Sequence, residues 1–200
     1  MRRPWLLVIV GGFLLGALIG MGAMILNTDM HGNRVKTSGT ALIGGPFELV
    51  GRGGSTVTDK DFRGRYILVF FGFTHCPDIC PAELQVMSAA LEDLGADAKK
   101  VVPIFITLDP ERDTPDAVAA YVANFGPSFV GLTGSPEQIA KAAKAYRVTY
   151  QKFQDESMGD NYSIDHSALV YLMGPDGQFV THIPYGTSPD KMAETLRRYL

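Results

Sequence analysis

Continuous apolar runs alternate along the chain with segments whose apolar residues recur at helical spacing. "RYILVFFGF" (65–73) and "VVPIFITL" (101–108) are uninterrupted runs of strand-forming residues, typical of strands that are buried on both faces. Between them, helical spacing begins near residue 78 and ends at Gly95, a typical helix stop. The apolar side chains at that spacing are Leu84, Met87, Leu91 and Leu94. The pattern predicts a strand, a helix and a second strand.

Capping residues and turns predict the remaining elements of the domain. Three helices are expected to open at Thr114-Pro115, Ser135-Pro136 and Ser188-Pro189, because proline at the first helical position loses no hydrogen bond. "FELV" and "STVT" flank "GRGG" as a short hairpin, and "RVTYQKF", "ALVYLM" and "QFVTHI" are further strands. This order predicts an α/β sandwich around a mixed central sheet, spanning residues 41–200.

The N-terminal stretch is apolar without interruption, and no charged residue lies between Arg3 and Asp29. As a helix, residues 5–26 would be roughly 33 Å long, enough to cross a hydrocarbon core of ~30 Å. Arg2 and Arg3 place the start of the chain inside, which makes residues 1–4 a cytoplasmic stub and residues 27–40 a polar linker. We expect a single-pass anchor in a bacterial inner membrane, with the domain in the periplasm. A cleaved signal peptide is the alternative.

Composition narrows the classes of function. The 200 residues carry a formal net charge of −3 and have no basic cluster, which argues against a nucleic-acid surface. An apolar content of 46% is ample for a core, even after the N-terminal stretch is set aside. The chain has 2 cysteines, too few for a disulfide scaffold.

Both cysteines lie in "FGFTHCPDICPAEL", where a buried strand gives way to a helix. Unpaired N–H groups at a helix start stabilise a thiolate, and this arrangement resembles thioredoxins, although the spacing is C-x-x-x-C. If Cys76 and Cys80 lay on one regular helix, their Cβ atoms would be roughly 5–6 Å apart, wider than a disulfide prefers. A metal ion spans that gap more easily. The spacing favours metal binding and leaves a disulfide open.

A third ligand has to come from His31, His75, His166 or His182. His75 adjoins Cys76, and adjacent residues do not face the same point. His166 ends a loop just before the strand "ALVYLM", and in a thioredoxin-like fold this loop passes close to the cysteines. We therefore expect His166 to face the thiols. The neighbouring Asp165 is either a residue that orients the histidine ring or a solvated carboxylate.

Three blocks of the sequence resemble the signature motifs of the Sco/SenC family: "FGFTHCPDICP", "LDPERDTP" and "DHSALVYLMGPDGQF". "FVGLTGSPEQIAKAAKAYRV" resembles the segment between the second and third blocks, so that the likeness runs from about Ala41 to Leu200. It implies a membrane-anchored, thioredoxin-like copper chaperone that helps to assemble the CuA centre of cytochrome c oxidase. By motif position, the family's copper ligands fall on Cys76, Cys80 and His166, and Asp78 matches an acidic position.

The resemblance also implies partners: subunit II of the oxidase as copper acceptor, a periplasmic copper donor and a thiol reductant. Two thiolates and an imidazole suit Cu(I) and can hold Cu(II). The main alternative is a thiol–disulfide reductase that keeps the acceptor's thiols reduced. A peroxidase is a less favoured function. It would need an arginine beside a reactive cysteine, and the sequence does not place the nearest ones, Arg63 and Arg65, beside Cys76. In "LDPERDTP", Asp109, Arg112 and Asp113 are expected to pair locally, with a docking surface as the alternative.

Overall fold

The computed structural model describes residues 43–154 and 162–200. Within these ranges no helix is both long enough and apolar enough to cross a bilayer. The stub, anchor and linker predicted over residues 1–40, and His31 with them, lie outside the described residues and stay predictions.

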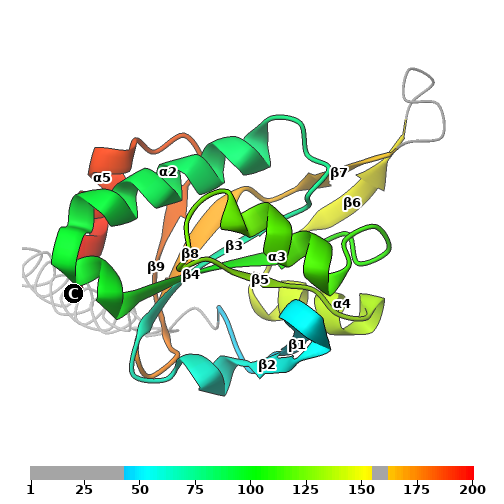
Figure 1. Cartoon of the computed structure of the whole chain (residues 1–200), viewed down its shortest axis with the longest axis horizontal. Coiled ribbons are helices and arrows are strands. Elements are labelled where there is room, and N and C mark those ends of the chain that lie inside the picture. The colour runs from blue at the N-terminus through cyan, green and yellow to red at the C-terminus, as the bar shows by residue number, and fades with distance from the viewer. Residues whose placement is uncertain (1–42, 155–161) are drawn as a thin grey trace, which may run out of the picture. The chain divides into compact units, whose positions relative to one another are not determined.

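A five-stranded mixed sheet forms the centre of the fold, in the order β5-β4-β3-β8-β9 (Figure 1). β3 is the middle strand and pairs in parallel with β4 and antiparallel with β8. Nearly every side chain of β3 and β4 is buried, as their continuous apolar sequences predicted. The strands are β3 (Tyr66–Gly72), β4 (Val101–Thr107), β5 (Val130–Leu132), β8 (Leu169–Met173) and β9 (Phe179–Pro184).

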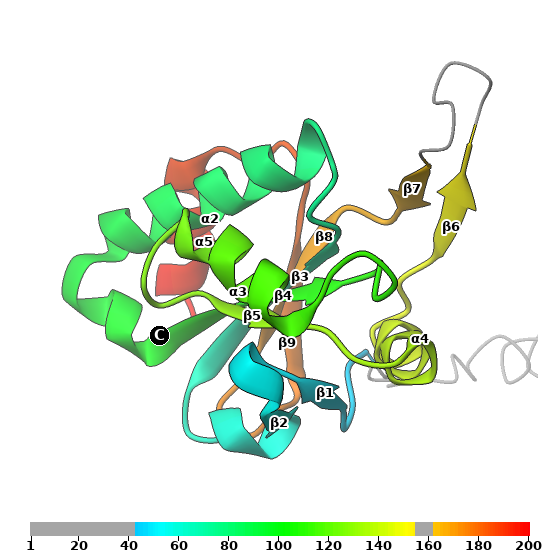
Figure 2. The same ribbon diagram turned by 45° about the vertical axis from the view of Figure 1, so that its right-hand side comes forward.

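Helices cover both faces of this sheet. α2 (Ile79–Leu94) connects β3 to β4 and packs against α5 (Pro189–Arg197) (Figure 1). α3 (Pro115–Ala123) connects β4 to the parallel β5, and a right-handed connection places it on the same side as α2. α4 (Pro136–Ala145) lies on the other side with the small hairpin of β1 (Glu48–Val50) and β2 (Thr56–Thr58) (Figure 2). The predicted α/β sandwich is confirmed.

The predicted helix starts are also confirmed, although their caps differ. The Thr114 side chain accepts a hydrogen bond from the Ala117 N–H at the start of α3. Ser135 and Gln138 form the expected capping box of α4. Ser188 precedes α5 without a side-chain bond to the helix.

Two features were absent from the sequence prediction. β5 is a strand of 3 residues at the edge of the sheet. The predicted strand "RVTYQKF" forms β6 (Tyr150–Phe153), but it does not join the main sheet. It pairs instead with β7 (Ser163–His166) in a two-stranded ribbon that projects from the body of the domain (Figure 2). Since β7 has one buried apolar residue, Ile164, its sequence lacks a strand pattern.

Candidate metal centre

The two cysteines lie on either side of the start of α2. Cys76 is in the loop after β3 and is half-buried, whereas Cys80 is in the first turn of α2 and is fully buried. The two cysteines therefore do not share one regular helix, and the Cβ separation expected for that case does not apply to them. Gly72, the last residue of β3, makes room for the buried thiol, because a Cβ atom there would lie 2.7 Å from Cys80 Sγ.

The Cys80 thiol and the helix start together lower the pKa of Cys76. Its sulfur accepts a hydrogen bond from the Cys80 thiol, which is the main cause that lowers the Cys76 pKa to about 5. Partial burial opposes this shift, and backbone N–H groups of the helix start reinforce it; the Cys80 N–H is 3.4 Å from the sulfur. In turn, donating to Cys76 and burial raise the pKa of Cys80. One thiolate and one thiol are thus the resting pair. Both cysteines are free in this structure.

His166, the last residue of β7, faces the cysteines as expected. Its Nε2 atom lies 3.7 Å from Cys80 Sγ. Its Nδ1 atom is 3.1 Å from the Ser167 carbonyl oxygen. Because a carbonyl only accepts, this bond requires a hydrogen on Nδ1 and leaves the Nε2 lone pair of the neutral ring facing the sulfur. The ring also packs edge-on against Phe70 and Phe73, with centroids 6.1 Å away in each case.

The three donor groups fit a small soft metal ion. Bonds of about 2.3 Å to a thiolate and about 2.0 Å to an imidazole, meeting at a trigonal ion, place the two donor atoms roughly 3.7 Å apart. The Cys80–His166 separation has this value. Cys76 and His166 both line an open pocket of about 310 Å³, which gives an ion a route to solvent. Apolar side chains, among them Ile79 and Phe153, line the same pocket.

The other described histidines lie away from the thiols or face another group. The ring of His182 stacks on Phe179 in β9, with 6.4 Å between centroids. The Nδ1 atom of His75 is 3.5 Å from an Asp113 carboxylate oxygen, so that this ring faces the loop after β4. Asp165 is exposed, and the bond that fixes the His166 ring goes to Ser167 instead.

The arginines considered for a peroxidase are at the wrong end of β3. Arg63 and Arg65 precede that strand and Cys76 follows it, and 7 residues of strand span roughly 23 Å. Arg63 forms an ion pair with Asp59. Neither arginine can activate the Cys76 thiol.

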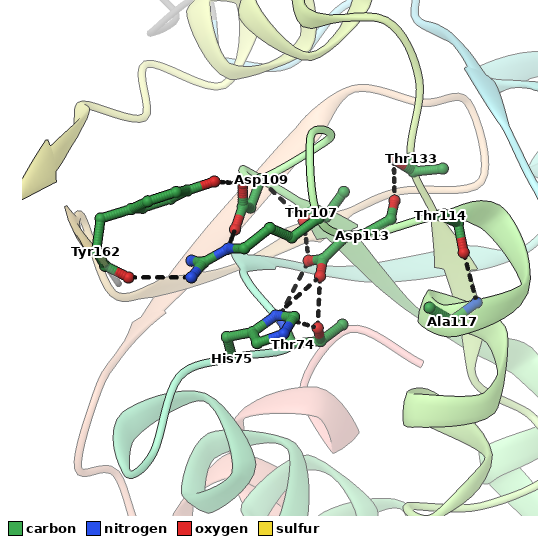
Figure 3. A network of polar contacts seen from close by, with 10 residues as sticks. Thr74, His75, Thr107, Asp109, Asp113, Thr114, Ala117, Thr133 and Tyr162 are labelled. Atoms are coloured by element: carbon green, nitrogen blue, oxygen red, sulfur yellow. Dashed lines mark hydrogen bonds and ion pairs between the residues drawn. The ribbon is translucent and has the colours of Figure 1, made fainter. Parts of the chain in front are cut away.

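The "LDPERDTP" loop pairs only partly within itself. Asp109 and Arg112 form the expected ion pair. Asp113 instead reaches the cysteine loop, residues 73–78 between β3 and α2. There it accepts hydrogen bonds from the backbone N–H and the hydroxyl of Thr74 (Figure 3). Sequence spacing gave no signal for this contact, because 39 positions separate the two residues. Nor did it identify Tyr162, whose hydroxyl donates to Asp109 at 2.6 Å.

His75, Asp109 and Asp113 also form a compact group, with one possible ligand atom from each within 4.8 Å of the others. Their carboxylates already accept hydrogen bonds, Asp109 from Arg112 and Tyr162, and Asp113 from Thr74 and Thr107. A metal ion would have to displace these donors. The group is therefore a hydrogen-bonded network rather than an open set of ligands.

A central strand, a cysteine pair at the start of the following helix and a histidine before the next antiparallel strand define a thioredoxin-like protein in which a histidine faces two cysteines. Comparisons with known proteins agree. The family model described as SCO1/SenC matches residues 35–200. The chain belongs to the SCO1/SenC family.

Individual relatives show how far the likeness extends. The mitochondrial SCO1 homologue of Homo sapiens is 40% identical over 172 residues, covering 84% of this chain and 56% of that protein. The chain thus spans little more than half of that relative's length. An SCO2-like protein of Rickettsia conorii is 36% identical, covering 90% of this chain and 91% of that protein.

Solved structures of homologous Sco proteins have the same fold as this chain. The structure of Bradyrhizobium japonicum ScoI with copper bound is 46% identical and has a TM-score of 0.72, covering 79% of this chain and 99% of that chain. Homologous Sco structures thus have copper bound. The solved structure of BsSco, a member of the Sco family of cytochrome c oxidase assembly proteins, is 24% identical with a TM-score of 0.63 and shares the fold.

Proposed function

We propose that this protein is a copper metallochaperone that binds one copper ion through Cys76, Cys80 and His166. The observation that carries the proposal is the 3.7 Å approach of His166 Nε2 to Cys80 Sγ, beside the acidic thiol of Cys76. Two sulfur donors and an imidazole form a soft set that suits Cu(I) and also holds Cu(II). Copper bound to homologous Sco proteins supports the choice of metal.

The recipient is proposed to be the CuA centre in subunit II of cytochrome c oxidase. Transfer needs an incoming thiolate to reach the ion, and the pocket beside Cys76 and His166 is open to solvent. Exposed apolar side chains at its rim, Ile79 at 39% and Phe153 at 51% exposure, favour a protein partner over a small molecule. A periplasmic copper donor and a thiol reductant complete the cycle, and no nucleic acid takes part.

The proposed location follows from the N-terminal sequence. Residues 5–26 anchor the chain in a bacterial inner membrane, and residues 27–40 connect the anchor to a periplasmic domain. This arrangement would keep the metal centre near a membrane-bound oxidase.

A thiol–disulfide reductase is the second candidate function, because Cys76 has the low pKa and partial exposure of an attacking thiolate. The two functions differ in their need for His166. Dithiol exchange requires an attacking and a leaving sulfur but no imidazole ligand. Copper carriage requires all three groups, since two thiolates alone hold Cu(II) poorly.

Metal analysis of the full-length chain in detergent tests the proposal. We expect one copper per chain, with tight binding abolished by Cys76→Ser or Cys80→Ser. His166→Ala should lose most Cu(II) binding but keep the dithiol–disulfide couple, whereas the control His182→Ala should bind copper normally. In cells at low copper, His166→Ala should fail to support oxidase assembly. Full oxidase activity with His166→Ala but not with Cys76→Ser would establish the reductase instead.

A further inference from the structure

The loop between β4 and α3 contacts the cysteine loop through Asp113. The Asp113 carboxylate is fully buried. It accepts a 3.0 Å hydrogen bond from the Thr74 N–H and further bonds from the hydroxyls of Thr74 and Thr107 (Figure 3). Thr74 lies two residues before Cys76, so Asp113 fixes the backbone from which that cysteine projects.

The same loop contacts the histidine ribbon, the two strands β6 and β7, through Asp109, which is also fully buried. Asp109 accepts the 2.6 Å hydrogen bond from the Tyr162 hydroxyl, and Arg112 donates to the Tyr162 carbonyl oxygen at 3.1 Å. The Arg112 guanidinium lies 3.7 Å from the centre of the Tyr162 ring, and the Lys152 ammonium lies 4.6 Å from it. Tyr162 immediately precedes β7, the strand that ends in His166. These contacts hold the start of that strand.

The two carboxylates belong to one tight turn. The Asp113 N–H donates to the Asp109 carbonyl oxygen at 2.9 Å. The Thr107 hydroxyl accepts from the Asp109 N–H at 2.9 Å and donates to the Asp113 carboxylate. The loop therefore connects the cysteine loop and the histidine ribbon through a single hydrogen-bonded unit (Figure 3).

We infer that Asp109, Asp113 and Tyr162 are positioning residues that fix the histidine strand relative to the cysteine loop, so that three metal donors from two separate segments are held at bonding distance. The inference rests on the proposed copper centre. The Asp109–Tyr162 contact lies on the His166 side of this unit, and the Asp113–Thr74 contact lies on the Cys76 side.

Tyr162→Phe tests the contact on the histidine side, since it removes one hydroxyl and keeps the ring that Arg112 and Lys152 contact. We expect Cu(II) affinity of the full-length chain to fall roughly 10-fold, as is typical when a partner that orients a ligand is lost. The electron paramagnetic resonance spectrum of bound Cu(II) should shift toward that of His166→Ala. Cu(I) affinity should change much less, because both sulfurs remain. Tyr199→Phe is the matched control: its ring is 42% exposed at the far end of the chain.

A double-mutant cycle separates positioning from general stability. If Tyr162 acts through His166, then Tyr162→Phe should have no further effect on Cu(II) affinity in the His166→Ala background. In the metal-free protein it should speed amide hydrogen exchange in β7 while leaving β3 unchanged. An equal loss of Cu(II) affinity in both backgrounds would overturn the inference.

The inference can fail separately from the proposed function. A wild-type Cu(II) spectrum that depends on His166, together with an unchanged Tyr162→Phe variant, would refute positioning and leave the copper centre intact. If the wild-type and His166→Ala proteins gave the same Cu(II) spectrum, the proposed copper centre would be refuted. In that case, amide hydrogen exchange in β7 of the Tyr162→Phe variant still tests the inference. Faster exchange would support the role of Tyr162 in holding β7, and unchanged exchange would refute it.

Discussion

His166 Nε2 lies 3.7 Å from Cys80 Sγ, although 86 positions separate the two residues in the sequence. The antiparallel pairing of β3 with β8 explains the approach. Phe70, near the end of β3, is opposite Val170, near the start of β8. A residue just before β8 therefore lies beside the loop that follows β3. The sheet register brings the histidine to the cysteines.

The two sulfurs should differ sharply in reactivity. With a pKa of about 5, Cys76 is a thiolate across neutral pH, whereas the hydrogen bond to Cys76 and burial raise the pKa of Cys80 and keep it protonated. In the metal-free protein, alkylation by iodoacetamide should therefore rise with pH around 5 and level off by pH 7. An ordinary cysteine, with a pKa of about 8.5, would still be accelerating there. Mass spectrometry of the labelled chain should locate the adduct on Cys76.

The control for this experiment is Cys80→Ala. It removes the thiol that donates to Cys76, the largest cause of the low pKa. The alkylation curve of Cys76 should move to higher pH in this variant. An unmoved curve would show that the helix start alone stabilises the thiolate.

Glu83 should make the fold less stable as the pH rises. This residue of α2 is only 1% exposed, and burial raises its pKa to about 7 against the opposing effect of the Gly186 backbone. The folded state therefore keeps a proton that the unfolded chain loses near pH 4.5. The free energy of unfolding should fall between about pH 4.5 and 7 and then level off, with a total loss of at most about 3 kcal/mol.

Glu83→Gln removes this titration and should flatten the pH profile of urea unfolding between pH 5 and 8. Glu92→Gln, on an exposed position of the same helix, is the control and should keep the wild-type profile. If the two variants gave the same slope, Glu83 would not be the responsible group.

Gly72→Ala should destabilise the fold and disturb Cys80. The added methyl group would lie 2.7 Å from Cys80 Sγ and 2.9 Å from the Phe105 ring, so one of them must move. Overpacking of this kind costs about 1–3 kcal/mol, measurable by chemical denaturation. Gly45→Ala is the matched control, because its methyl group would meet the Ala145 Cβ atom at an ordinary 3.6 Å. Equal stability of the two variants would contradict the close contact.

The N-terminal topology can be tested with enzyme fusions. An alkaline phosphatase fused after residue 40 should be active and sediment with the membranes, because the enzyme folds only outside the cytoplasm. The same enzyme fused after Arg3, without the apolar segment, should be inactive. Release of an active, shortened fusion into the soluble periplasmic fraction would favour a cleaved signal peptide.

The elements best predicted from sequence are those whose pattern is set by burial. β3 and β4 are apolar throughout because both faces are covered, and the start of α4 is set by a local capping box. β5, of 3 residues, and β7, of 4, escaped prediction because neither carries an extended apolar run and each is held in place by pairing with its neighbour. Local sequence carries little information about such pairing.

The sequence predicted the candidate ligand residues of the site but not the hydrogen bonds that hold their segments in place. Cys76 and Cys80 stand out by spacing, and fold position identified His166. The contacts Thr74–Asp113 and Tyr162–Asp109 join residues 39 and 53 positions apart, with no periodicity to reveal them. Only the folded backbone shows which carboxylate meets which hydroxyl.

The unequal burial of the two sulfurs gives any exchange of ligands at this centre a direction. Cys80 is closed off from solvent and Cys76 is partly open to it. In the proposed copper centre, an incoming donor would approach from the Cys76 side, so the Cys80 bond would be the last that a departing ion breaks. Arrival would run the same path in reverse, with the buried sulfur binding first and the more open donors completing the set.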